Sequence, residues 1–331
     1  MGAILTCLFF VFFFFSPQRF NVLEMVGPGV TPEHGVTGYA GDPTQGPACA
    51  IACGAGTIYR NYFAPTNGQI GQTEDNQLDG IAEMRDMLCD KLGKPRGSLW
   101  RMRNGYCMPS RETLYLIAEY LEKADEATLD ELRAKLSIGL HWDVEITDGR
   151  EDRKNPLFLS QAYCSALPVS YCGHSRTGYW DDFATLVLES LYESTLLAGI
   201  LHARQGGNNK VYLTQVGGGA FGNSRVWIEK AVRRALAKFR DWDLDVIMVC
   251  YGSTDSWIRN LIDEMHPPRP RMAMSMDDGS DGDVVEDEEE GSSSDFADYE
   301  KDTGATLSLT GSMPGLSSSG DNNNNNNNAF K

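Results

Sequence analysis

The sequence predicts a mixed α/β domain in which helices cover both faces of a central sheet, giving three layers. Two observations predict it. Long apolar runs without polar alternation, such as residues 244–252, are typical of strands that are covered on both faces. Between these runs lie segments whose apolar residues recur at helical spacing, so strands and helices alternate along the chain.

The first half of the domain is predicted from local patterns. Residues 47–59 (PACAIACGAGTIY) predict a buried strand that enters a Gly-rich turn, and residues 64–76 predict a second turn. Apolar residues recur at helical spacing over 78–92 and 113–124, so each segment predicts a helix. The Thr128-x-x-Glu131 pattern predicts a capping box that opens a further helix.

The second half predicts strands over 138–146, 158–169, 211–216 and 244–252. A long helix is predicted over 181–203, with Leu197 and Leu201 facing inward, and another over 226–239, with Val226 on its apolar side. The folded domain is therefore expected over residues 21–266, with a helical insertion at about 93–140.

The C-terminal tail, residues 267–331, is predicted to be disordered. Residues 277–302 hold thirteen acidic side chains and one lysine, so this stretch carries twelve of the seventeen net negative charges. Ser/Gly-rich sequence and seven consecutive asparagines follow, a composition with too little apolar surface to offset the entropy of ordering. We expect such an acidic tail to bind a basic partner.

The first eighteen residues are a separate hydrophobic segment. Six of the seven residues from Phe9 to Phe15 are phenylalanine, yet the segment lacks the positive start of a signal peptide and is short for a membrane span. Met1-Gly2 with Thr6 fits the myristoylation pattern. Because a pyrimidine-rich intron end would encode such Phe-rich sequence, we also expect that residues 1–18 are a retained intron in a mispredicted gene. Membrane contact is predicted only if this segment is translated.

Composition excludes some classes of function. Basic residues gather on no stretch of the chain, so nucleic acid is not an expected partner. The eight cysteines form no CxxC pair, so neither a metal site nor a cofactor is predicted. Apolar surroundings favour reduced thiols, which predicts a cytoplasmic or nuclear protein.

A Gly-rich loop is the main candidate site. Gly217, Gly218, Gly219 and Gly222 follow a predicted strand and precede a predicted helix. Glycines let the backbone approach a phosphate closely, free N–H groups point at it, and the helix dipole favours negative charge. We therefore expect a phosphorylated small molecule at this loop.

Three segments, in order, resemble the macrodomain family, which binds ADP-ribose. Gly41-Asp42-Pro43-Thr44 with the run CAIACGAG is similar to that family's first ligand turn and the strand behind it. Residues 188–200 are similar to the helix before its phosphate strand, and VYLTQVGGGAFGN is similar to its phosphate loop. The resemblance spans about residues 41–251.

The resemblance implies a ligand-binding set and a reaction. Asp42 would accept a hydrogen bond from adenine, and Phe221 would pack on the distal ribose. Where hydrolytic members place asparagines at that ribose, this chain has Cys53 and Gly56. A reader of ADP-ribosylated protein and a hydrolase both stay open. The implied diphosphate ligands are Gly217, Gly218, Gly219, Ala220, Phe221, Gly222 and Asn223, with Gly68 and Gly71 on the opposite side, and Asn61 and Asn67 are the catalytic candidates of the hydrolase.

Two other classes of protein share these features. Gly217-x-Gly219-x-x-Gly222 also spells the fingerprint of a Rossmann-type dinucleotide-binding protein. That fingerprint normally opens the first βα unit, whereas only one more predicted strand follows it in this domain. The third class is a non-catalytic interaction protein that binds partners through its acidic tail.

Overall fold

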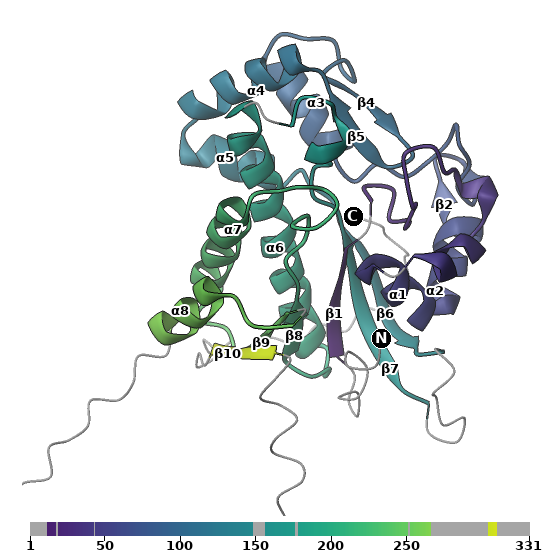
Figure 1. Cartoon of the computed structure of the whole chain (residues 1–331), viewed down its shortest axis with the longest axis vertical. Helices are drawn as coiled ribbons and strands as arrows, with labels where there is room; N and C mark the ends of the chain where they lie inside the picture. The colour runs from purple at the N-terminus through teal and green to yellow at the C-terminus, as the bar shows by residue number, and fades with distance from the viewer. Residues whose placement is uncertain are drawn as a thin grey trace, which may run out of the picture.

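The computed structural model describes residues 12–17, 19–42, 44–147, 156–175, 178–250, 252–265 and 304–309. Over these described residues the protein is mixed α/β, with one six-stranded sheet and two small hairpins (Figure 1). The strand order is β10-β9-β8-β1-β7-β6. The strands of this sheet are β1 (Phe12–Pro17), β6 (Gly139–Glu145), β7 (Phe158–Cys164), β8 (Lys210–Leu213), β9 (Leu244–Val249) and β10 (Gly304–Leu309).

The middle of the sheet is parallel. Strand β1 pairs in parallel with β7 and with β8, and β8 pairs in parallel with β9. The edge strands β6 and β10 are antiparallel to their neighbours. Because parallel strands run in one direction, the carboxyl ends of these four strands lie at the same edge of the sheet. This edge is where ligands bind in open α/β sheets.

The central strand β1 comes from the hydrophobic segment that the sequence placed outside the domain. Residues 12–17 lie between β7 and β8 and pair with both. Without a strand in this position, β7 and β8 would each present an unpaired edge inside the sheet. The domain therefore begins before residue 21. The retained-intron hypothesis stays a prediction, but any sequence that precedes Arg19 has to supply this strand.

The strand predicted over residues 47–59 is wrong, because this segment is helical. It forms α1 (Gln45–Ala52), α2 (Gly54–Ile58) and a π-helical turn, η3 (Tyr59–Phe63). Pro47 lies in the first turn of α1, where its missing N–H loses no hydrogen bond. Small side chains allow α1 to pack closely on β1. A short apolar run of this kind fits a strand and a buried helix equally well.

Helix α6 (Asp181–Arg204) packs on the sheet and is covered by α7 (Arg225–Lys238). In Figure 1 these two helices lie to the left of β1, while α1 and α2 lie to its right. By length and composition the stretch Gly178–Arg204 would suit a membrane span, but 83% of its apolar window is buried inside the protein. It is therefore a core helix. Its Leu197 and Leu201, and Val226 of α7, were predicted to face inward but are exposed.

The predicted helical insertion contains a hairpin as well as helices. Strands β4 (Trp100–Arg103) and β5 (Tyr106–Pro109) pair within it. The capping box predicted at Thr128 is wrong, because Asp125 caps the helix and accepts a hydrogen bond from the Thr128 N–H at 2.9 Å.

The remaining elements are α3 (Ala82–Lys91), α4 (Arg111–Lys123), α5 (Glu126–Arg133), α8 (Ser256–Met265), β2 (Pro65–Thr66), β3 (Gln69–Ile70), η1 (Pro32–His34), η2 (Thr37–Gly41), η4 (Val169–Tyr171) and η5 (Gly178–Trp180).

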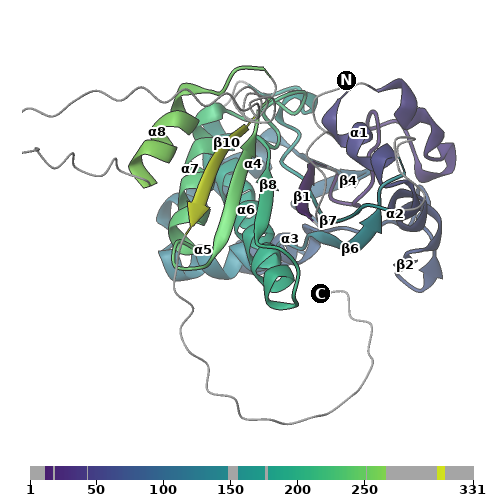
Figure 2. The ribbon, with the colours of Figure 1, turned by 90° about the horizontal axis from the view of Figure 1, so that it is seen from below.

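Part of the tail differs from the predicted disorder. Strand β10 lies in residues 267–331 and pairs antiparallel with β9 along its full length (Figure 2). Its sequence, GATLSL, contains residues that fit a pleated surface, and β9 would otherwise offer an unpaired edge. The acidic stretch 277–302 and the asparagine run lie outside the described residues.

Candidate functional site

The Gly-rich loop, residues 217–222, connects β8 to α7 at the carboxyl edge of the sheet. Gly217 and Gly222 have φ of 79° and 72°, the left-handed region that favours glycine. A Cβ on Gly217 would lie 2.6 Å from Asn223 Nδ2, and one on Gly222 would collide with Ser170 Oγ. These two glycines are therefore required by the fold of the loop.

The tip of the loop has unused hydrogen-bond donors. The N–H groups of Gly218 and Gly222 donate inside the loop, to Gln215 O and Gly219 O. In contrast, the N–H groups of Gly219, Ala220 and Phe221 donate to no acceptor among the described residues. Gly218, Gly219, Ala220 and Gly222 are exposed. The loop thus presents backbone donors at the surface, close to the N-terminus of a fourteen-residue helix.

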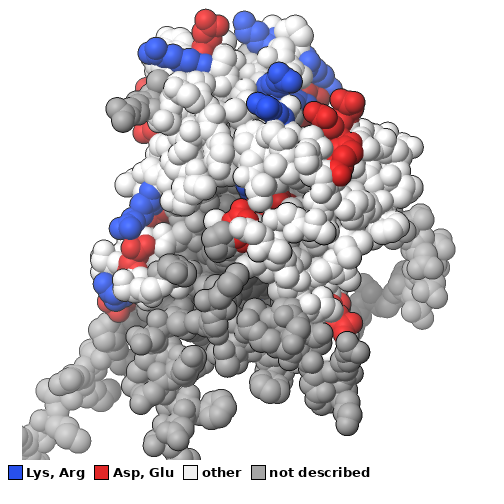
Figure 3. Space-filling model, turned by 45° about the vertical axis from the view of Figure 1, so that its right-hand side comes forward, with Lys and Arg blue, Asp and Glu red and all other residues white. Residues whose placement is uncertain are grey.

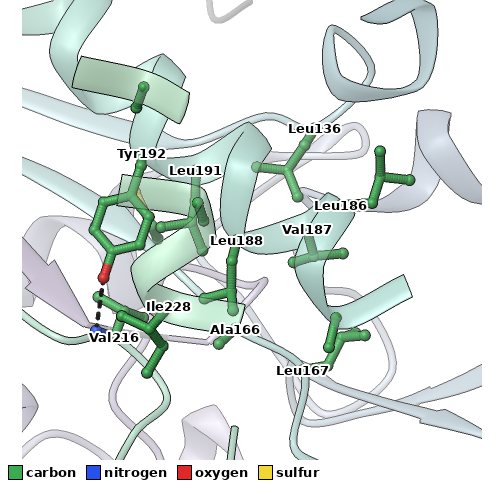
Figure 4. Close-up of a cluster of buried hydrophobic side chains, with 14 of the residues drawn as sticks. Leu136, Ala166, Leu167, Leu186, Val187, Leu188, Leu191, Tyr192, Val216 and Ile228 are labelled. Carbon is green, nitrogen blue, oxygen red and sulfur yellow. Dashed lines mark hydrogen bonds between the residues drawn. The ribbon is translucent and has the colours of Figure 1, made fainter. Parts of the chain in front are cut away.

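Buried hydrogen bonds hold the base of this loop. The Tyr192 hydroxyl donates to Thr214 O at 2.7 Å and accepts from Val216 N–H at 3.1 Å. Figure 4 shows Tyr192 reaching from α6 to Val216 among packed leucine and valine side chains. On the other side, Asn223 Nδ2 donates to Leu167 O at 2.8 Å. The loop is therefore positioned by α6 and by the segment after β7.

Phe221 packs into the core instead of facing a ligand. Its ring lies 5.6 Å from that of Tyr106 and 5.7 Å from that of Tyr171. The Arg19 guanidinium lies 4.6 Å above it, and only 8% of the residue is exposed. The implied stacking of Phe221 on a ribose does not agree with this geometry, because the ring anchors the loop from below.

A buried ion pair lies directly beside this anchor. Arg19 and Glu24 belong to the segment that follows β1, and their Nη1 and Oε1 atoms are 3.1 Å apart. Arg19 Nη2 also donates to Met25 O at 2.7 Å. The pKa of Glu24 is raised to about 7, mainly because burial disfavours the charged carboxylate; Arg19 lowers this pKa, and the charge of Asp42 adds to the rise. The sequence reading missed this pair, because two charges within an apolar run look like a solvated loop.

A second buried polar cluster is formed around Arg60, whose charge reaches Glu24. The Arg60 guanidinium is buried and lies 3.6 Å above the Tyr163 ring, and Arg60 Nε donates to Val22 O at 2.8 Å. Burial and the charge of Arg60 lower the pKa of His141 to about 4. The cavity beside these residues measures only about 10 Å³, room for at most one water. This cluster is therefore structural packing.

Asp42 and Asn61 make local hydrogen bonds. Asp42 Oδ1 accepts from Thr44 N–H at 2.9 Å, so it closes a turn, although its charge reaches Glu24. Asn61 is 1% exposed and its Nδ2 donates to Pro32 O at 3.1 Å. A side chain this buried cannot contact a ribose at the surface, so the structure does not support Asn61 as a catalytic residue.

Asn67, Gly68 and Gly71 belong to the β2–β3 hairpin. Asn67 Nδ2 donates to Asn76 Oδ1 at 2.8 Å, and a Cβ on Gly71 would lie 2.6 Å from Tyr62 O. Figures 1 and 2 both place β2 on the opposite side of the molecule from α7. The structure therefore does not bring these residues to the Gly-rich loop, and they serve the turn.

Cys53 and Gly56 lie on the helical segment, not on a strand. Cys53 is fully buried, and the pocket that a side chain at Gly56 would fill is occupied by His141, whose Nδ1 would be 2.6 Å from a Cβ. The seven cysteines that the structure describes form no disulfide with one another. Among these described residues no three His, Cys, Asp or Glu side chains are grouped so as to hold a metal ion.

The surface near the middle of the molecule is hollowed. Figure 3 shows a recess there, with acidic and basic atoms visible inside it, while most other charges lie along the upper part and the left edge.

No protein-family model, curated protein or solved structure matches this chain.

Proposed function

We propose that this protein binds ADP-ribose or a closely related nucleotide diphosphate, with the diphosphate on the Gly-rich loop. The observation that carries the proposal is a set of N–H groups, at Gly219, Ala220 and Phe221, that donate to no acceptor among the described residues. Gly219 and Ala220 are exposed, and the set lies between a parallel strand and a helix N-terminus. Such groups stabilise a phosphate through hydrogen bonds and through the helix dipole.

The arrangement of the sheet supports the same proposal. The loop lies at the shared carboxyl edge of β1, β7, β8 and β9, as nucleotide sites do in open α/β sheets. Helices flank this sheet on the two sides of β1. We propose that they form the three layers of a macrodomain-like fold, with ADP-ribosylated protein as the partner.

The proposed setting is a reducing compartment, the cytoplasm or the nucleus. All seven described cysteines are unbridged, which suits that environment. A basic partner for the acidic tail remains part of the proposal, and the acidic stretch lies outside the described residues.

The test is isothermal titration of ADP-ribose, ADP and NAD into wild type and two glycine variants. Gly219 and Gly178 are both exposed, and a Cβ on either meets no atom within 4 Å. Gly219→Glu places a carboxylate where the phosphate should lie, so we expect affinity to fall at least about a hundredfold. Gly178→Glu adds the same charge elsewhere and should leave affinity unchanged.

Each other outcome contradicts the proposal in a defined way. Equal affinity of wild type and Gly219→Glu would remove the loop as the phosphate site. A preference for NAD together with hydride transfer would favour a Rossmann-type protein. Absence of binding to all three ligands would favour the interaction protein.

A further inference from the structure

Helix α2 and the π-helical turn η3 present an apolar surface to the outside of the molecule. Their exposed side chains recur at the spacing of one helical face, and none of them is charged: Ala55, Ile58, Tyr59, Tyr62 and Phe63. Ile70 of the hairpin that follows is also exposed. Ile58, Tyr59, Tyr62, Phe63 and Ile70 are called the apolar face below.

The polar side chains of the same segment point into the protein. Thr57, Arg60 and Asn61 are each at most 3% exposed. Their side chains donate hydrogen bonds to the carbonyl oxygens of Ala50, Val22 and Pro32, at 2.6, 2.8 and 3.1 Å respectively. Rotation of the segment to bury its apolar side would leave these groups unpaired, at a large cost in free energy. The fold therefore holds the apolar face outward.

An apolar face held outward in this way is typical of a protein interaction site. Contiguous exposed apolar surface is uncommon on monomeric proteins and marks places where partners bind, and π-helical turns occur frequently at functional sites. Figure 1 shows α2 on the opposite side of β1 from α7. The apolar face is therefore separate from the Gly-rich loop and its proposed ligand.

The border of the apolar face is acidic. The Tyr62 hydroxyl lies 2.7 Å from the position that a Cβ on Gly35 would take. Near Gly35 in the chain, Glu33 Oε1 accepts a hydrogen bond from the Glu74 N–H at 2.8 Å, and Glu33 and Glu74 are both exposed. Residues 26–81 hold five acidic side chains, and the one arginine among them is buried. This charge favours a partner with basic groups around an apolar stripe.

The size and charge of the face suit a short helix better than a second copy of this chain. Tyr59, Tyr62 and Phe63 are 40, 43 and 56% exposed, which leaves about 280 Å² if a whole aromatic side chain offers about 200 Å². A standard protein–protein interface buries about 800 Å² on each partner. In a symmetric dimer the same surface meets itself, so Glu33 and Glu74 would face like charges.

We infer that the apolar face docks an amphipathic helix of a partner protein, with Lys or Arg on both borders of the apolar stripe of that helix. Apolar residues at helical spacing on the partner pack against Ile58 and Phe63. The basic groups of the partner lie opposite Glu33 and Glu74 at the border. The apolar contacts supply affinity, and the border charges select the partner and speed its association.

The test uses a fluorescent synthetic helix of about 18 residues, with leucine along one face and lysine on its two borders. Fluorescence anisotropy gives its Kd for the full chain. Ile58→Ser/Phe63→Ser should weaken binding at least about tenfold, because two apolar contacts are lost. Leu197→Ser/Leu201→Ser is the matched control, because both leucines are exposed on α6, and it should bind as wild type does. All these proteins carry the same acidic tail, so its attraction for lysine cancels.

A second pair of measurements tests the acidic border. Glu33→Gln/Glu74→Gln keeps the Oε1 acceptor of Glu33 and removes both charges, so it should bind the lysine peptide about three- to tenfold more weakly at low salt. Wild type should bind a peptide with glutamate in place of lysine at least about tenfold more weakly. Equal binding in either comparison would overturn the basic character of the partner.

Four results would overturn the docking of a partner helix. Ile58→Ser/Phe63→Ser that binds the lysine peptide as tightly as wild type would place the peptide elsewhere, and a monomeric wild type that does not bind the peptide would exclude this occupant. A dimer in sedimentation velocity that this variant converts to monomer would identify a second copy. Binding that begins only after deletion of residues 1–11 would show that this segment covers the face.

Discussion

The pH dependence of stability is the most direct physical consequence of the buried Glu24. The carboxyl group has a pKa of about 7 in the fold, against 4.5 when it is exposed to water. Ionisation is therefore harder in the native state than in the unfolded chain. Below pH 4.5 both states hold the proton, and this group does not oppose folding. As pH rises from 4.5 to 7 the unfolded chain loses its proton first, so stability falls.

The magnitude follows from the difference between the two pKa values. It corresponds to about 3 kcal/mol of unfolding free energy, fully lost above pH 7. Glu24→Gln has no proton to lose at this position. The difference in unfolding free energy between the variant and wild type should therefore shift by about 3 kcal/mol in favour of the variant between pH 4.5 and 8.

The assay is urea denaturation of both proteins at several pH values. Taking the difference cancels the contributions of the other titrating groups, which the two proteins share. A constant difference across this pH range, within about 0.5 kcal/mol, would show that Glu24 is not buried as the structure has it.

Three further predictions concern the elements that hold the loop and the insertion. Tyr192→Phe removes the hydroxyl that bonds Thr214 O and Val216 N–H, so unfolding free energy should fall by about 1–2 kcal/mol and ligand affinity should fall with it; denaturation and titration indistinguishable from wild type would contradict this. Gly199→Ala places a Cβ 2.5 Å from a Val211 methyl group. This overpacking should lower the free energy of unfolding by about 1–3 kcal/mol in urea denaturation. An unchanged urea midpoint would argue against the close approach of α6 to β8. Arg133→Ala leaves the buried carboxylate of Glu189 without its ion-pair partner. The free energy of unfolding, measured by urea denaturation, should fall by about 3–5 kcal/mol. A loss below about 1 kcal/mol would refute the buried pair.

Local patterns predicted the elements whose type depends on nearby residues. Helix α6 and the strand–loop–helix unit of β8 and α7 were predicted from periodicity and glycines. The structure has both helices at nearly the same bounds, while β8 ends at Leu213, three residues before the predicted end. A long amphipathic repeat or four glycines between a strand and a helix leaves few alternatives. The position of the Gly-rich loop was therefore predictable.

The sequence could not decide which apolar segment fills the middle of the sheet. Residues 47–59 and residues 12–17 are both short apolar runs, and only pairing with β7 and β8 selects the second. Once that position is filled, the first run packs against the sheet as helices. Strand β10 likewise depends on the free edge of β9.

By itself, the sequence determined the mixed α/β class, the long core helix and the exposed glycine loop, because periodicity and backbone freedom act within a few residues. Tertiary structure alone decided what surrounds that loop. It turned Phe221 inward, buried Asn61, moved Asn67 to a distant hairpin and brought Arg19 and Glu24 beside the loop. Burial and charge proximity depend on segments far apart in the chain, so the chemistry of the site becomes visible only after folding.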